Sequence, residues 1–157
     1  MNQCNPAGGH ASAGFFLPAP RGYDNAMPAE LTEIEFIVVD DTAAARAALQ
    51  AAALAGRKVM LVSPPATSAA MGPGVFAESI VQAKAGLEHA LAGAVFDCGD
   101  AAGLAMAALR LGGIDVLADL PDDTAGKIAE LAAAHGRRAW RRGADGLMLS
   151  TLPGEPA

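Results

Sequence analysis

Four short apolar runs alternate along this chain with alanine-rich stretches, and this alternation restricts the fold to a small number of classes. The runs lie at residues 36–39, 59–62, 94–96 and 116–118. Each is followed by acidic or small residues and then by a segment that a helix-capping residue could open. Strands that alternate with helices pair in parallel, because each helix returns the chain to the start of the next strand. The sequence therefore predicts one α/β domain with a parallel sheet of four to five strands and helices packed on it.

The same pattern places the individual elements. We expect strands at 35–39, 58–62, 93–96, 114–118 and 138–141, with an edge strand or docked tail at 147–149. We expect helices at 43–55, 75–90, 101–111 and 124–135. The capping residues would be Asp41 or Thr42 for the first helix, Asp100 for the third, and Thr124 or Asp123 for the fourth. The second helix should bury one face, formed by Phe76, Ile80, Ala83 and Leu87.

Two architectures fit this order of elements. One is a flavodoxin-like, five-stranded sheet with helices on both faces. The other is a curved sheet like half of a (β/α)8 barrel, closed by dimerisation. Strand order distinguishes them, and the sequence leaves that order open. In both architectures a ligand would bind at the carboxyl ends of the strands.

The first thirty residues differ from the rest of the chain. They are rich in glycine and proline and show no hydrophobic periodicity, which is typical of a loop or a disordered arm. The exception is the apolar run Phe15, Phe16 and Leu17, which could dock on the body of the protein or on a neighbouring subunit. We therefore expect a flexible or docking arm at 1–30 and an α/β domain at 31–157.

Charge and composition restrict the partners. The net charge of -6 and the pI near 4.9 argue against nucleic-acid binding and against binding to anionic membranes, which both need a basic surface. No apolar run reaches the roughly 20 residues of a membrane-spanning helix, and no secretory signal is recognisable, so a cytoplasmic protein is expected. The chain is 52% hydrophobic but only 4% aromatic. Such an apolar composition favours a homo-oligomer, most simply a dimer.

The segment Asp97, Cys98, Gly99 and Asp100 is the first candidate site, because it joins an expected strand end to a helix start. Amide groups and the helix dipole at such a position stabilise a thiolate, whereas the flanking carboxylates oppose its formation. Cys98, Asp97 and Asp100 are thus candidate catalytic residues. In the alternative reading Cys98 is a small buried residue and Asp100 is a helix cap.

The long loop at 63–74 is the second candidate site. It is rich in hydroxyl groups and leads into a helix, whose first amides can bind phosphate or carboxylate. The candidate ligand-binding residues are Ser63, Thr67, Ser68, Gly72 and Gly74. Residues 72–77 match the pattern GxGxxA, but they begin nine residues after Ser63 rather than directly after the strand. The alternative is a lid or an interface loop built from turn residues.

Carboxylates also follow the expected strands, at Asp40, Asp97 and Asp119. Carboxylate oxygens are ligands that Mg²⁺ prefers. We predict no metal at these strand ends and keep a cation site formed by the three carboxylates as the weaker alternative. The stretch 37–41, with Arg46, Leu49 and Gly56, resembles the opening of a response-regulator receiver domain. That resemblance covers about twenty residues and implies that paired acids hold Mg²⁺ and that Asp97 accepts a phosphoryl group. The hydroxyl residue and the Lys-Pro pair that the family carries further along are missing.

A basic segment at 137–142 contains four arginines and the only tryptophan. In a strand, Arg138, Trp140 and Arg142 would share one face. Arginine and tryptophan are typical of interfaces, so a solvated edge or a subunit contact is expected, with an anion-binding patch as the alternative.

The preferred hypothesis is a small cytoplasmic, homo-oligomeric domain that binds a phosphate- or carboxylate-bearing ligand at the strand ends. The alternatives are a lyase, isomerase or transferase that uses Cys98 or Asp97, and an interaction module of receiver-like or structural type. The sequence assigns no cofactor, and it does not decide whether the protein is an enzyme.

Overall fold

The strands of the sheet follow one another in space in the same order as in the sequence. The structure, a computed structural model, describes residues 16–17, 34–66, 71–143 and 146–149. Its elements are β1 (Phe16–Leu17), β2 (Glu35–Val38), α1 (Thr42–Leu54), β3 (Val59–Val62), α2 (Pro73–Ala83), η2 (Glu88–Ala90), β4 (Leu91–Asp97), α3 (Ala102–Leu111), β5 (Asp115–Leu117), α4 (Asp122–Ala134), β6 (Ala139–Gly143) and β7 (Gly146–Leu149). The predicted α/β domain with a parallel sheet is confirmed.

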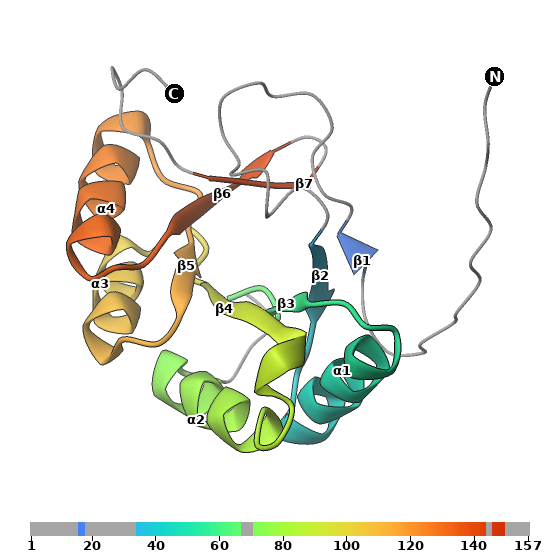
Figure 1. Ribbon diagram of the computed structural model, residues 1–157. Helices are drawn as coiled ribbons and strands as arrows, with labels where there is room; N and C mark the ends of the chain where they lie inside the picture. Colours follow the sequence, from blue (N-terminus) through green and yellow to red (C-terminus); the bar gives the residue numbers. More distant parts are fainter. Residues whose placement is uncertain (1–15, 18–33, 67–70, 144–145, 150–157) are drawn as a thin grey trace, which may run out of the picture.

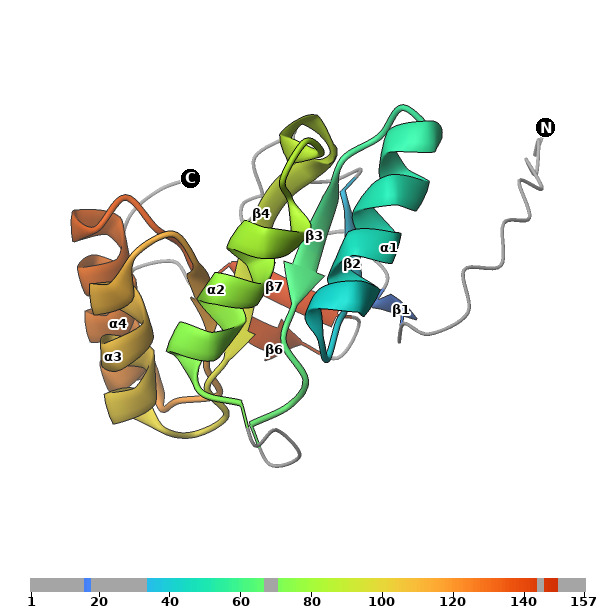
Figure 2. The same cartoon turned by 90° about the horizontal axis from the view of Figure 1, so that it is seen from below.

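Strands β2 to β6 pair in parallel, while β1 and β7 add to the two edges in antiparallel orientation. This sequential order is that of a half-barrel, since a flavodoxin-like sheet has the order 2-1-3-4-5. Right-handed crossovers that all step in one direction place every helix on the same face of the sheet. Figure 2 shows α1 to α4 on that one face. Of the two predicted architectures, the described residues therefore form the half-barrel, and not the sheet with helices on both faces.

The helices cover the convex face of the sheet with small side chains. Alanine lets a helix backbone approach the strands closely, as it does where α1 buries Ala45 and Ala52 on either side of Leu49. The predicted buried face of α2 is confirmed for Phe76, Ile80 and Ala83, which are all buried. Leu87, the fourth predicted member, lies beyond the end of the helix and is half-buried. Phe76 packs on Phe96 of β4 with the ring centroids 5.7 Å apart.

The concave face has its own apolar cluster, and that cluster shows how strongly the sheet curls. Phe36 of β2 and Trp140 of β6 meet edge to face, with ring centroids 5.2 Å apart and an interplanar angle of 78°. Three strands separate β2 from β6 in the sheet, so only a tight curl brings these rings together. Figure 1 shows the strands on an arc, with the helices outside it and β6 and β7 returning toward β2. The buried members of the cluster are Phe36, Met60, Val62, Val95, Leu117 and Trp140.

The helix ends differ in part from the prediction. Asp41 caps α1 as expected, and its carboxylate accepts a hydrogen bond from the Ala44 amide at 2.6 Å. The predicted caps of the third and fourth helices are wrong: the N-cap residues are Ala101 and Pro121, and neither makes a side-chain cap bond. In α4, Asp122 and Asp123 lie in the first turn and place negative charge at the helix start, where the helix dipole favours it.

The second helix ends earlier than predicted. It stops at Ala83, and a short 3-10 turn, η2, follows after Gly86. Gly86 has φ = +77°, a left-handed conformation that glycine adopts readily and that does not continue a helix.

Part of the expected N-terminal arm lies on the body of the protein. Phe16 and Leu17 form β1 and pair with Ile37 and Phe36 of β2. The rest of the expected arm, Phe15 included, lies outside the described residues. Within the described part of the chain, no helix has the length and hydropathy that crossing a bilayer requires.

Candidate functional site

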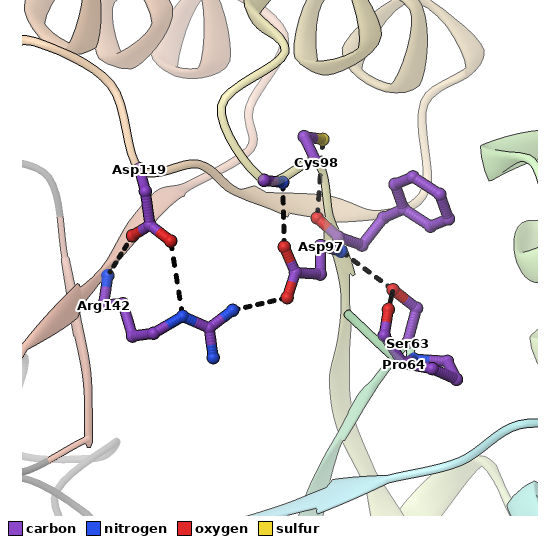
Figure 3. A network of polar contacts seen from close by, with 8 residues as sticks. Ser63, Pro64, Asp97, Cys98, Asp119 and Arg142 are labelled. Carbon is purple, nitrogen blue, oxygen red and sulfur yellow. Dashed lines mark hydrogen bonds and ion pairs between the residues drawn. The ribbon is translucent and has the colours of Figure 1, made fainter. Parts of the chain in front are cut away.

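Polar side chains from neighbouring strands meet at the carboxyl end of the sheet (Figure 3). Asp97, the last residue of β4, is almost fully buried, and its carboxylate has two partners. Its Oδ1 accepts a hydrogen bond from the Gly99 amide at 2.9 Å, and its Oδ2 accepts one from Nη2 of Arg142 at 2.5 Å. The Asp97 amide donates to Oγ of Ser63 at 2.8 Å, which ties the ends of β3 and β4 together. The Asp97 carboxylate is therefore held in one orientation.

Arg142 of β6 is shared between two carboxylates. Its Nε lies 3.3 Å from Oδ2 of Asp119, and its backbone amide donates to Oδ1 of Asp119 at 3.2 Å. Asp119 and Asp97 therefore both bind the Nε and Nη2 edge of the guanidinium. The remaining nitrogen, Nη1, points away from both carboxylates (Figure 3). We call Asp97, Asp119 and Arg142 the open cluster, since the Arg142 and Asp119 side chains are 41% and 45% exposed.

The electrostatics of the open cluster keep Arg142 charged. Burial alone would lower the pKa of the guanidinium, but the charges and hydrogen bonds of Asp97 and Asp119 outweigh it and raise that pKa above its ordinary value. Two carboxylates surround one guanidinium, so the cluster carries a formal charge of about -1. The two carboxylates therefore orient the Arg142 guanidinium while its side chain stays partly exposed to solvent.

Strand register explains why these residues meet. Asp97, Leu117 and Trp140 lie side by side on β4, β5 and β6. Side chains two residues apart share a face of a strand, so Asp119 and Arg142 continue the rows of Leu117 and Trp140 toward the carboxyl end. The backbone is fixed there as well, because the Asp119 amide donates to the Gly99 carbonyl at 2.8 Å.

Cys98 lies next to Asp97 in sequence but on the other face of the sheet. It is 1% exposed and packs in the apolar cluster under the helices. Burial, and secondarily the negative charge of Asp97, raises the pKa of the Cys98 thiol to about 12. The thiol therefore stays protonated at neutral pH, and the strand separates it from the open cluster.

The structure describes three of the five candidate ligand-binding residues, Ser63, Gly72 and Gly74. Ser63 is buried, and its hydroxyl both accepts from the Asp97 amide and donates to the Pro64 carbonyl at 3.2 Å. Thr67 and Ser68 lie outside the described residues. Gly72 is the N-cap of α2 and Gly74 lies in its first turn, and both are exposed. Asp100 is exposed beside α3.

The alternative cation site does not assemble in the described residues. Asp40 follows β2, and strand β3 lies between β2 and β4, which carries Asp97. A receiver-like arrangement, in which the paired acids adjoin the acceptor aspartate, is therefore absent from this sheet. Nowhere in the described ranges do three His, Cys, Asp or Glu side chains come close enough to hold a metal ion. A guanidinium, not a cation site, lies between Asp97 and Asp119.

A second polar cluster lies at the opposite end of the concave face, and the sequence analysis did not identify it. Asp115 of β5 is 3% exposed and accepts three hydrogen bonds: from the Arg138 amide at 3.1 Å, from Arg138 Nε at 2.9 Å and from Trp140 Nε1 at 3.1 Å. We call Asp115, Arg138 and Trp140 the closed cluster. The predicted shared face of Arg138, Trp140 and Arg142 is confirmed, but Trp140 is buried and cannot anchor a partner.

Fold and clusters together define an α/β protein with a curled, half-barrel parallel sheet and an arginine-centred polar site at the carboxyl ends of its strands. Comparison of the chain with protein-family models, with curated proteins and with solved structures finds no match.

Proposed function

We propose that the protein binds a small metabolite that carries an oxyanion, phosphate or carboxylate, at the carboxyl ends of its strands, with Arg142 as the anchor. The observation that carries the proposal is the geometry of the guanidinium: Asp97 and Asp119 hold one edge, and Nη1 points away from both. The N–H groups on the other edge, those of Nη1 and the second proton of Nη2, match the oxygens of a carboxylate or phosphate. Its position also agrees with the general rule for ligand sites in parallel sheets.

The excess of carboxylates over arginine in the open cluster narrows the ligand class. An oxyanion alone would face the charges of Asp97 and Asp119 as well as that of Arg142. Hydroxyl or amino groups beside the oxyanion would offset this repulsion, because they donate hydrogen bonds to the carboxylates. The proposed ligand is therefore a hydroxylated or aminated compound with one oxyanion. The amide groups of the first turn of α2, around Gly72 and Gly74, remain a candidate for holding a second part of the ligand.

Isothermal titration calorimetry with glycerol 3-phosphate, which combines an oxyanion with hydroxyl groups, tests the proposal. Arg142→Gln should weaken binding by about tenfold or more, since a charge-assisted hydrogen bond is lost. Arg141→Gln is the matched control, because the Arg141 guanidinium pairs with the exposed Asp122 and not with the open cluster. Glycerol, which lacks the phosphate, should give no heat. Absence of saturable binding to the unmodified protein, or equal affinity of the Arg142→Gln variant, would contradict the proposal.

We also propose that the chain is a homo-oligomer. The support is the set of large apolar side chains exposed on the helical layer, among them Val75 of α2 and Leu111 of α3, which are 60% and 57% exposed. Native mass spectrometry should give a multiple of the 15.7 kDa chain mass, and a monomer at micromolar concentration would refute the proposal.

A further inference from the structure

We propose that Asp119 is an internal competitor for the ligand: its carboxylate occupies the Nε side of Arg142 in the free protein, and the oxyanion of the ligand displaces it. This inference rests on the proposed function and adds to it how the site is regulated. It follows from an asymmetry between the two carboxylates that share Arg142.

The two carboxylates differ first in how deeply their side chains are buried. Asp97 and Asp119 both contact the same guanidinium, but their side chains are 3% and 45% exposed. The Asp97 carboxylate also accepts a hydrogen bond from the Gly99 amide. The Asp119 carboxylate, by contrast, has two partners in the described residues, and both belong to Arg142. Solvent can therefore replace the contacts of Asp119 when its side chain turns away, but it cannot reach Asp97 in the same way.

The two carboxylates differ second in their distances to Arg142. The Arg142 to Asp97 contact measures 2.5 Å, while the two contacts to Asp119 measure 3.2 and 3.3 Å. Long and exposed ion pairs contribute little, because water and salt screen them. Of the two carboxylates, Asp119 is the one that an external oxyanion can replace.

Displacement requires only a side-chain rotation. The Asp119 amide is bonded to the Gly99 carbonyl, and the preceding Ala118 amide is bonded to the Trp140 carbonyl at 3.0 Å. The backbone at Asp119 is therefore held on both sides while the carboxylate reaches outward to Arg142 (Figure 3). Once the carboxylate has turned away, Nε joins Nη1 and the second proton of Nη2 as a donor for the ligand. The ligand oxyanion then takes the position of the Asp119 carboxylate on the Nε side of Arg142.

The consequence is that wild-type affinity is lower than the site could provide. Replacing Asp119 by asparagine removes the competing charge and leaves Asp97 to orient Arg142. The replacement of Asp122 is the matched control, because Asp122 is also an exposed carboxylate next to an arginine of β6, namely Arg141. Both variants lose one negative charge, so a general charge effect would change both alike.

The experiment titrates inorganic phosphate and, separately, acetate into wild type, Asp119→Asn, Asp119→Ser and Asp122→Asn. We expect both Asp119 variants to bind at least one of these oxyanions about tenfold more tightly than wild type, with Asp122→Asn within about twofold. A gain in affinity for phosphate alone, or for acetate alone, identifies the oxyanion that the site prefers. A second readout is the NMR signal of the Arg142 Nε–H group, which should move on phosphate binding in wild type if the oxyanion replaces Asp119.

The outcomes separate this inference from the proposed function. If wild type binds through Arg142 and both Asp119 variants bind equally or more weakly in both arms, the competitor role is overturned and the proposed function stands. If only the Asp119 variants bind, both are supported. If neither wild type nor the Asp119 variants bind phosphate, acetate or glycerol 3-phosphate, both are overturned.

Discussion

Arg138, just before β6, and Arg142, inside β6, pair with carboxylates at opposite ends of the concave face, and the two pairings differ. In the closed cluster, a single buried carboxylate, Asp115, receives three donors from Arg138 and Trp140. In the open cluster, one guanidinium, that of Arg142, is divided between a buried and an exposed carboxylate. The closed cluster gives the buried Asp115 carboxylate three donors, and it lies next to the contact between Phe36 and Trp140. The open cluster leaves donor capacity unused at the edge where parallel sheets bind ligands.

Arg138 and Arg142, four residues apart, thus have different surroundings: one is packed into the structure and the other is available for binding. Arg138 lies over the Trp140 ring at 5.5 Å and also near Gly93, where an added Cβ would come 3.4 Å from its Nη2. It is packed from several sides. Arg142, four residues further along the chain and inside β6, instead reaches across to Asp97 and Asp119 at the carboxyl end (Figure 3). Residues at the amino end of such a sheet are typical of stability and those at the carboxyl end of function.

The largest effect is expected at the closed cluster. Asp115→Ala should lower the free energy of unfolding by about 3–5 kcal/mol, because it leaves the Arg138 guanidinium and the Trp140 indole N–H without their buried partner. Urea denaturation followed by tryptophan fluorescence measures it. Asp122→Ala, at an exposed pair, should cost less than about 0.5 kcal/mol. Equal losses in the two variants would abolish the distinction between a buried and an exposed carboxylate.

The free energy of unfolding should depend on alkaline pH through Cys98, which is buried under the helices on the convex face. The pKa of Cys98 is about 12 in the folded protein and near 9 when the chain is unfolded. Below pH 9 the thiol is protonated in both states and its contribution to stability is complete. As pH rises from 9 toward 12 the unfolded chain loses its proton first, so stability should fall by about 1.4 kcal/mol per pH unit.

The measurement compares unfolding of a Cys4→Ser variant with that of a Cys4→Ser, Cys98→Ala double variant between pH 8 and 11. The alkaline slope should be steeper in the protein that keeps Cys98, and iodoacetamide should label Cys98 slowly at pH 7.5. Identical slopes and rapid labelling would show that the thiol is accessible from the open cluster.

A smaller effect is expected from removing the arginine of the open cluster. Arg142→Gln should lower the free energy of unfolding by about 1–2 kcal/mol, since buried Asp97 loses its cation but keeps the Gly99 amide as a partner. The same denaturation experiment measures it. A loss as large as that of Asp115→Ala would make Arg142 primarily structural and would remove the contrast between the two ends.

Local pattern in the sequence was enough for most of the fold. Strands and helices follow from apolar runs and from stops such as Gly56, and the buried face of α2 follows from the spacing of Phe76 and Ile80. Strand order depends on the direction of each crossover, which is a property of packing between distant segments. The contact of Phe36 with Trp140 joins residues 104 positions apart (140 − 36 = 104), so no local window contains it.

The candidate site was predicted only in part, for the same reason. Asp97 was identified because it ends a strand, and the alternation of Arg138, Trp140 and Arg142 was visible in the sequence. What joins Asp97 to Arg142 is the register of three neighbouring strands, and the sequence does not state it. Asp115 was missed because a single acid inside an apolar run gives no sign of the three donors that satisfy it in the fold.

The most direct test is an NMR titration of the isotope-labelled protein with glycerol 3-phosphate, because it observes both ends of the concave face at once. We expect saturable shifts of the amide signals of Gly99, Asp119 and Arg142, and unchanged signals for Asp115 and Arg138. Shifts confined to the closed cluster, or no saturable shifts at the open cluster, would contradict the central claim that the protein binds an oxyanion through Arg142.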